Sequence, residues 1–240
     1  MEPRFKITLS DRTLGNGLST FHLQQIRSIL LDRGMVLLPS DTCYALAAIP
    51  GDKEVYKLIN KILNRGKLPM SLAFPNFERV QYYVKVNVIV ANLIEVFTPG
   101  PITVVCKPLS ENVREKKVKD VINSTDGTIG VRISDSHIER EVAGCSFFPI
   151  TTAAVRDENG NVVQDFNKAI EIVTNGTQKN KFTNWAVIEG NNFLSQHSTV
   201  VRVDYSSNEV IILRKGLITE QQIKKGIENR FPQWAREEWP

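Results

Sequence analysis

Three small polar residues, Ser40, Asp41 and Thr42, follow a short apolar run early in the chain. The run, residues 35–38, is predicted to be a buried strand that ends at a proline. Ligands of α/β proteins tend to bind at the carboxyl ends of strands, and two hydroxyls with a carboxylate offer several hydrogen bonds to a polar substrate. Residues 40–42 therefore form a candidate polar ledge, the alternative being a turn that only caps the next element.

Hydroxyls and cations recur at the ends of later predicted strands. One threonine follows the stiff Pro-Gly-Pro turn at residues 99–101, and one arginine lies inside the otherwise apolar strand predicted at 128–133. A buried arginine is costly unless a structural carboxylate or a bound anion pairs with it, and both alternatives stay open here. A serine–threonine pair and a last arginine flank the two final strands, which suits a carboxylate or phosphate ligand. These candidates are Thr103, Arg132, Ser198, Thr199 and Arg214.

The sequence lacks the motifs of several common enzyme classes. It contains no GxxxxGK[ST] phosphate loop, no GxGxxG dinucleotide fingerprint and no GxSxG nucleophile elbow. Its three cysteines form no CxxC pair and its three histidines lie far apart in the chain. We therefore predict neither a disulfide framework nor a protein-bound metal.

Length and composition indicate one globular domain. The chain has 240 residues, of which 42% are hydrophobic and 23% charged, so a core can form without disulfides. The 30 basic and 26 acidic residues give a net charge of +4, which fits anionic ligands without indicating a polycation. No stretch approaches the ~18 apolar residues of a membrane helix, and the first residues lack the apolar core of a signal peptide. A cytoplasmic protein without a membrane partner is expected.

Periodicity predicts strands interleaved with helices, and these elements must position the candidate residues. The first helix is expected to have Ser19 as its N-cap and to end at Arg33 and Gly34, with the glycine left-handed. The fold class is α/β (α+β), and the clustering of strands late in the chain favours a mixed sheet. Strands are predicted at 5–9, 35–38, 71–74, 102–106, 128–133, 149–155, 186–188, 199–204 and 210–213, and helices at 19–31, 52–62, 77–83, 88–97 and 219–229.

Taken in order, five strings resemble the YrdC-like family, which comprises the threonylcarbamoyl-AMP synthases and their YciO relatives. That family reads P-T-[DE]-[TS]-x-Y-G-L, then P-G-P-x-T, T-x-G-[VI]-R-[VI]-P, S-T-V-[VI] and a closing apolar-R-x-G. The counterparts here are residues 33–46, 99–103, 128–134, 198–201 and 213–216. The order holds over roughly residues 18–217, and five blocks in order are far more specific than any one of them.

The resemblance implies a fold, a reaction and partners. The implied fold is a twisted mixed sheet flanked by helices, with a concave basic cleft, in a YrdC-like domain at residues 1–217 followed by a helical tail at 218–240. The implied substrates are ATP, L-threonine and bicarbonate, with Mg²⁺ as helper. The products are threonylcarbamoyl-AMP and pyrophosphate, and the former supplies the N6-threonylcarbamoyl modification of adenosine 37 in tRNA. RNA or tRNA-modification proteins are then possible partners.

The resemblance also assigns roles to individual residues. It places Ser40, Thr42, Arg132, Ser198 and Thr199 against threonine, with Arg132 meeting the carboxylate and Asp41 as the acid of the first motif. It makes Lys61, Arg65 and Arg132 the catalytic cations. The nucleotide side is assigned to Lys61, Arg65, Lys67, Thr103, Thr151, Thr152 and Arg214.

Three departures from the family pattern fall mainly on the nucleotide side. Where the family has K-x-R, this chain has Lys61 and Arg65, which on a helix would share a face, and Lys67 on the following loop. Where the family has T-S-A-N, residues 151–156 read Thr-Thr-Ala-Ala-Val-Arg, and the serine and the asparagine are lost in either register of the match. Ala45 replaces the glycine of the first motif. The YciO branch varies in the same places, and we therefore expect slow or divergent adenylation.

Two functional interpretations follow. The first is an adenylating enzyme of this family. The second is a nonenzymatic YciO-like homologue that binds nucleotides or double-stranded RNA, for which the basic run at 114–119 offers contacts to an RNA backbone. YrdC-like domains also occur in larger carbamoyltransferases, but the sequence shows no second catalytic domain. Calorimetry and pyrophosphate release with threonine, ATP and bicarbonate would separate these interpretations.

Overall fold

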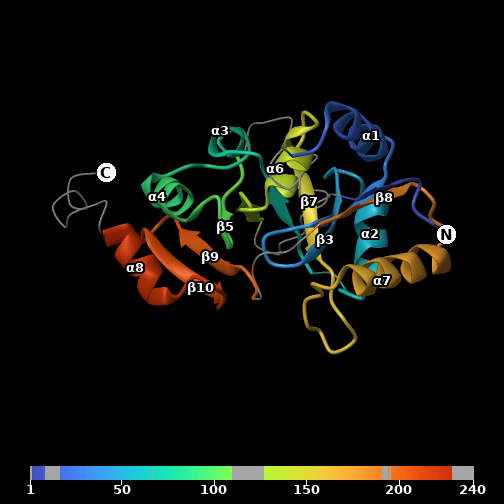
Figure 1. Ribbon diagram of the computed structural model, residues 1–240. Coiled ribbons are helices and arrows are strands. Elements are labelled where there is room, and N and C mark those ends of the chain that lie inside the picture. Colours follow the sequence, from blue (N-terminus) through green and yellow to red (C-terminus); the bar gives the residue numbers. More distant parts are fainter. Residues whose placement is uncertain are drawn as a thin grey trace.

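Ten strands form one mixed sheet that runs through the described part of the computed structural model, residues 2–8, 17–66, 68–109, 127–190, 194 and 196–228 (Figure 1). The strand order is β1-β8-β2-β3-β7-β4-β6-β5-β9-β10. Both parallel and antiparallel pairs occur, which confirms the predicted α/β fold with a mixed sheet. The strands are β1 (Lys6–Thr8), β2 (Met35–Pro39), β3 (Tyr44–Ala48), β4 (Ser71–Ala73), β5 (Ile102–Cys106), β6 (Ile129–Arg132), β7 (Ile150–Ala154), β8 (Trp185–Glu189), β9 (Thr199–Asp204) and β10 (Glu209–Arg214).

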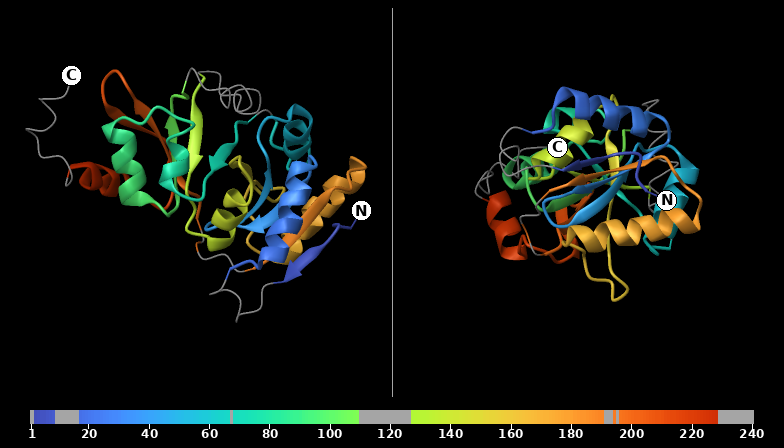
Figure 2. Two further views of the ribbon diagram at one scale, coloured as in Figure 1. Left: turned by 90° about the horizontal axis from the view of Figure 1, so that it is seen from above. Right: turned by 45° about the vertical axis from the view of Figure 1, so that its right-hand side comes forward.

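Helices cover both faces of the half of the sheet that contains β8 and β2. The side chains of β2 alternate, because successive residues of a strand point to opposite faces. Val36 and Leu38 pack with α1 and α6 on one face, and Met35 and Leu37 pack with α2 and α7 on the other. Figure 2 shows α1 and α7 on opposite sides of these strands. The helices are α1 (Thr20–Leu31), α2 (Lys53–Ile62), α3 (Phe77–Val80), α4 (Val88–Phe97), α6 (His137–Gly144), α7 (Phe166–Lys179) and α8 (Glu220–Glu228).

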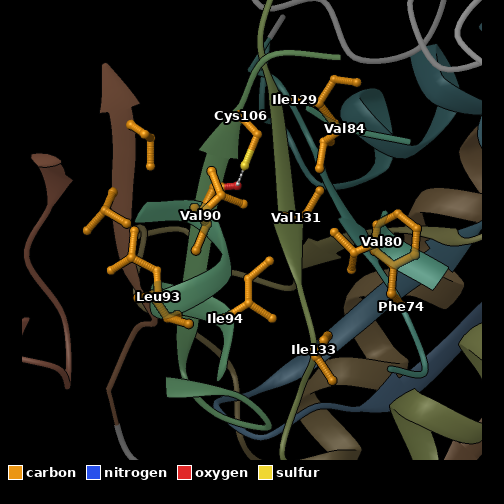
Figure 3. Close-up of a cluster of buried hydrophobic side chains, with 14 of the residues drawn as sticks. Phe74, Val80, Val84, Val90, Leu93, Ile94, Cys106, Ile129, Val131 and Ile133 are labelled. Carbon is orange, nitrogen blue, oxygen red and sulfur yellow. Dashed lines mark hydrogen bonds between the residues drawn. The ribbon is translucent and has the colours of Figure 1, made fainter. Parts of the chain in front are cut away.

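The other half of the sheet is covered on one face by α3, α4 and α8. Figure 3 shows this core, in which Leu93 and Ile94 of α4 pack toward Val131 of β6. Ile223 of α8 is 2% exposed within the same cluster, so α8 packs into the core. The division into a domain at 1–217 and a tail at 218–240 stays a prediction. On the opposite face of the sheet, the described side chains of β5, β6 and β9 line a cleft.

Capping residues in the sequence correctly mark where α1 and α2 begin. The Ser19 side chain accepts a hydrogen bond from the His22 amide, as predicted for the N-cap of α1, and Asp52 caps α2 in the same way. The expectation of a left-handed glycine after α1 is wrong, because Arg33 has the positive φ of 57°. Gly34 is needed for space, since a Cβ there would lie 2.5 Å from the Ile29 carbonyl oxygen. None of the described helices is long and apolar enough to cross a membrane.

Candidate active site

A cleft of about 1170 Å³ lies between the uncovered face of the sheet and a wall formed by the end of α2, the turn at 156–162 and α7. Its floor is made of small residues, with Ser71, Thr103 and Gly130 side by side on β4, β5 and β6. Most of the site residues predicted from the sequence line this cleft. They are Ser40, Thr42, Arg65, Thr103, Arg132, Thr152, Ser198 and Arg214. Their roles toward a ligand stay predictions.

Lys61 and Arg65 do not share a helix face, contrary to the expectation from their spacing. Helix α2 ends at Ile62, and Asn64 adopts a left-handed φ of 49° that turns the chain back. The Arg65 amide then donates to the Asn60 carbonyl at 2.8 Å, and Arg65 Nη2 donates to the Pro69 carbonyl at 3.0 Å. Arg65 consequently lines the cleft, whereas Lys61 is exposed outside it. Lys67 lies outside the described residues.

Residues 151–154 are placed by the alternation of β7. Thr151 points away from the cleft and donates to the Ala48 carbonyl at 3.1 Å. Thr152 and Ala154 line the cleft, and they fall on the serine and the asparagine of the family pattern if residues 151–154 are aligned with T-S-A-N. The Thr152 hydroxyl is buried and has no hydrogen-bond partner among the described residues. Thr199 also lies outside the cleft lining, because its hydroxyl donates to the Ile218 carbonyl at 2.7 Å.

The polar ledge at residues 40–42 is fixed by a buried ion network. Arg132 Nη2 donates to Asp41 Oδ1 and to Ser40 Oγ, and Arg132 Nε lies 3.6 Å from Glu139 Oε1. Ser40 Oγ donates to Glu139 Oε2 at 2.5 Å. Asp41 and Glu139 are completely buried, so structural carboxylates already balance the arginine. No hydrogen bond joins Arg132 Nη1 to any of the described residues, and Arg132 lines the cleft.

The protonation states within this network follow from opposing effects. Burial raises the pKa of the Asp41 carboxyl, but Arg132, the Asp135 amide and Ser40 together outweigh it and hold that pKa below its ordinary value. Burial lowers the pKa of Arg132, but Glu139 and Asp41 outweigh it and raise that pKa further. Arg132 and Asp41 are therefore both charged at neutral pH.

A second group of cations also lines the cleft, and the sequence identified only part of it. Arg214 is positioned by a bulge, since Ile212 pairs with Val201 and Arg214 with Val200. Its Nη2 donates to the carbonyl and the hydroxyl of Ser198, both at 2.9 Å. Arg156 and His197, which sequence reasoning missed, meet here with Arg156 Nη2 3.5 Å from His197 Nδ1.

The surroundings of His197 keep its imidazole neutral. Desolvation, Arg156 and Arg214 all lower the pKa of His197 below its ordinary value, because each disfavours the charged form. The cations of this group are therefore guanidinium groups, with the neutral imidazole of His197 beside Arg156. The only sequence signal that could have identified Arg156 as a site residue is its position directly after a predicted strand.

This arrangement suits a substrate or substrate pair that carries anions at two ends. Hydroxyls and Arg132 line the cleft together with Arg65, Arg156 and Arg214. Within the described residues, no cluster of three or more His, Cys, Asp or Glu side chains is placed to hold a metal ion. Hydroxyls and guanidinium groups bind carboxylates and phosphates through charge-assisted hydrogen bonds.

Sequence comparison identifies distant relatives that match most of the chain. The family model for Sua5, YciO and YrdC proteins, described as telomere recombination, matches residues 28–216. A Methanocaldococcus jannaschii protein named "Putative threonylcarbamoyl-AMP synthase" is 24% identical over 207 residues, which are 85% of this chain and 89% of the relative. An uncharacterized Haemophilus influenzae protein is 26% identical over 200 residues, covering 81% and 88% of the two chains.

Solved structures show the same fold. Sua5 of P. abyssi, crystallised with L-threonine, superimposes with a TM-score of 0.74 at 19% identity over 92% of this chain. This chain spans only 60% of that Sua5 protein. YciO of E. coli superimposes with a TM-score of 0.66 at 18% identity, covering 90% of this chain and 97% of YciO. With the family match extending over most of the sequence, the protein belongs to the Sua5/YciO/YrdC family.

Proposed function

We propose that this protein forms L-threonylcarbamoyladenylate from ATP, L-threonine and bicarbonate, releasing pyrophosphate. The observation that carries the proposal is the cleft itself, which hydroxyls and Arg132 line together with three guanidinium groups that have no carboxylate within 4 Å among the described residues. The M. jannaschii relative named for this activity and the threonine-bound Sua5 structure support the choice of reaction. The product would serve threonylcarbamoylation of tRNA.

For the threonine substrate, we propose that its carboxylate binds Arg132 Nη1. The hydroxyls of Thr42, Ser40 and Ser198 would lie next to it. All four residues line the cleft. Asp41 and Glu139 hold the Arg132 guanidinium in place and keep Ser40 oriented, so they are positioning residues. Thr199 is likewise a positioning residue, because its hydrogen bonds to Ile218 fix the start of β9.

On the nucleotide side, Arg65, Arg214, Thr103 and Thr152 would contact the phosphates. The threonine amine first captures CO₂ or bicarbonate as a carbamate, and a carbamate oxygen then attacks the α-phosphorus while pyrophosphate leaves. The protein needs no covalent nucleophile, because it acts by orienting two anions and neutralising the charge that develops between them. Mg²⁺ would reach the cleft bound to the triphosphate of ATP, since the described residues offer no metal-ligand cluster.

The proposed reaction is tested by pyrophosphate release from ATP. Release is expected only when threonine and bicarbonate are both present, and omission of either should return the rate to background. Calorimetric binding of threonine and of ATP, measured on the same preparation, separates failure of binding from failure of chemistry. Threonine binding without pyrophosphate release under any combination would contradict adenylation and support the nonenzymatic nucleotide- or RNA-binding alternative.

Turnover should be limited by Ala154, whose methyl group lines the cleft and which falls on the family's asparagine if residues 151–154 are aligned with T-S-A-N. Replacing Ala154 by asparagine would add an amide donor, and one hydrogen bond to a charged phosphate corresponds to about a 10- to 100-fold faster pyrophosphate release. Ala154→Leu is the matched control, because it fills the same space without an amide. An equal rise in the leucine variant, or none in the asparagine variant, would contradict this explanation of slow turnover.

A further inference from the structure

Three arginines reach the cleft from three different elements. Arg65 follows α2, Arg156 follows β7 and Arg214 ends β10, and all three line the same cavity. Each is held by neutral oxygens rather than by acids. Arg65 donates to the Pro69 carbonyl at 3.0 Å, Arg156 to the Gly160 carbonyl at 2.6 Å and Arg214 to the Ser198 carbonyl at 2.9 Å.

The acidic residues of the cleft do not neutralise this cluster. Asp157 pairs with Lys168 at 3.4 Å and accepts from the amides of Asn159 and Asn161. Glu158 and Glu171 also line the cleft, but across the described residues no ion pair joins either of them to an arginine. The charges of these three guanidinium groups are therefore not neutralised by a neighbouring acid. The charge of Arg132, in contrast, is balanced by Asp41 and Glu139.

These charges repel one another in the ligand-free protein. Burial, Arg156 and Arg214 lower the pKa of Arg65 to about 10. Desolvation, Arg156 and Arg132 likewise lower the pKa of Arg214. A positive charge that depresses its neighbour's pKa is destabilising the neighbour's charged form, and a bound anion would reverse that effect.

The turn that carries Arg156 is ordered by its own hydrogen bonds. Arg156 bridges to Val162, the Gly160 amide donates to the Asp157 carbonyl at 3.0 Å, and Gly160 supplies the positive φ of 82° that the turn requires. The small Ala154 side chain lies two residues earlier on the cleft side, and the buried Thr152 hydroxyl lacks a partner there. A positioned cation and an unpartnered hydroxyl that line the same cleft both suit an anionic ligand that accepts hydrogen bonds.

We infer that Arg156 is a polyphosphate-binding residue, and that with Arg65 and Arg214 it holds the phosphate chain of a nucleoside triphosphate or the pyrophosphate product. This inference rests on the proposed function for the identity of the nucleotide, but not for the chemistry of the subsite. Arg156 would supply a cationic donor to the cleft from the turn that follows β7. Its side chain acts on the ligand directly, which makes it a binding residue.

The test uses inorganic tripolyphosphate, which has the phosphates of ATP without the nucleoside. Arg156→Ala should weaken tripolyphosphate and ATP binding by about 10- to 100-fold at low salt, the range expected for hydrogen bonds to a charged group. Threonine binding should stay within twofold of wild type. The ligand-free variant should unfold at or above the wild-type temperature, because a repelling charge has been removed, while tripolyphosphate should stabilise it less.

Arg27→Ala is the matched control, since it also removes one positive charge, from an exposed position on α1 outside the cleft. Equal tripolyphosphate affinity in the Arg156 and Arg27 variants would overturn the inference. Its failure is distinguishable from failure of the proposed function. Wild-type pyrophosphate release by Arg156→Ala would overturn the inference alone, whereas Arg156-dependent tripolyphosphate binding without any pyrophosphate release would overturn the function alone.

Discussion

Replacing Arg132 by alanine should lower the free energy of unfolding by about 3–5 kcal/mol, because it strands two buried carboxylates without their cation. Asp41 and Glu139 are both 0% exposed, and Arg132 is the only cation that the described residues place within 4 Å of either. Urea denaturation at neutral pH, extrapolated to water, measures the loss. The effect on threonine binding should be read only under conditions in which the variant is folded.

Arg214→Ala is the matched control for this loss of stability. Arg214 lines the same cleft, but its partners are the oxygens of Ser198 and no carboxylate depends on it. We expect it to change the free energy of unfolding by less than about 1.5 kcal/mol. If both variants lose equally little, the buried carboxylates do not depend on Arg132, which would contradict the ion-pair explanation.

The pH dependence gives an independent check on the same network. The folded-state pKa of Asp41 is below its ordinary value of 3.8, so its contribution to stability is present above that value and is lost as the pH falls through the lower folded-state pKa. In Arg132→Ala, burial still raises the pKa of Asp41 while only the Asp135 amide and Ser40 oppose it, so the pKa is higher than in the wild type. The stability difference between wild type and variant should therefore shrink toward acid pH, and a difference independent of pH would contradict the ion-pair explanation.

The sequence predicted the elements whose signals are local. Ser19 and Asp52 mark the first residues of α1 and α2, and the Pro-Gly-Pro turn precedes β5 as expected. It did not predict β3, α6 or α7. All five residues of β3 are buried between β2 and β7, so the alternation that identifies a half-buried strand is missing. In α7, Gly176 opposes helix formation, and it is required because a Cβ there would lie 2.6 Å from Ile62 Cγ2.

The candidate site was predictable to the extent that its residues lie in short motifs. The ledge, Thr103, Ser198 and Arg214 all occur next to strands, and the fold brings them to one cleft. The partners that set their chemistry are not local. Asp41 meets Arg132 across 91 residues, and a single-sequence reading of that arginine left a structural carboxylate and a bound anion as equal alternatives. Arg156 was missed because its position depends on the turn at 156–162, which no spacing rule describes.

Replacing Arg214 by alanine should reduce kcat for pyrophosphate release by about 10²- to 10³-fold, the usual cost of removing one preorganised donor to transition-state charge. Arg214 is preorganised because the bulge in β10 and two hydrogen bonds from Nη2 to Ser198 fix its guanidinium before any ligand binds. Charge moves onto the bridging and leaving oxygens as the α-phosphorus is attacked, so the loss should fall on kcat more than on the KM for threonine.

Steady-state kinetics of wild type, Arg214→Ala and Arg214→Lys, with threonine and ATP varied in turn, measure this partition. The lysine variant keeps the charge but loses the forked geometry that reaches Ser198 and a phosphate together, so it should recover only part of the rate. Arg27→Ala should behave as wild type, because its charge is outside the cleft. A higher KM for ATP with kcat unchanged would contradict the transition-state role, since it would show that Arg214 contributes equally to ground-state and transition-state binding.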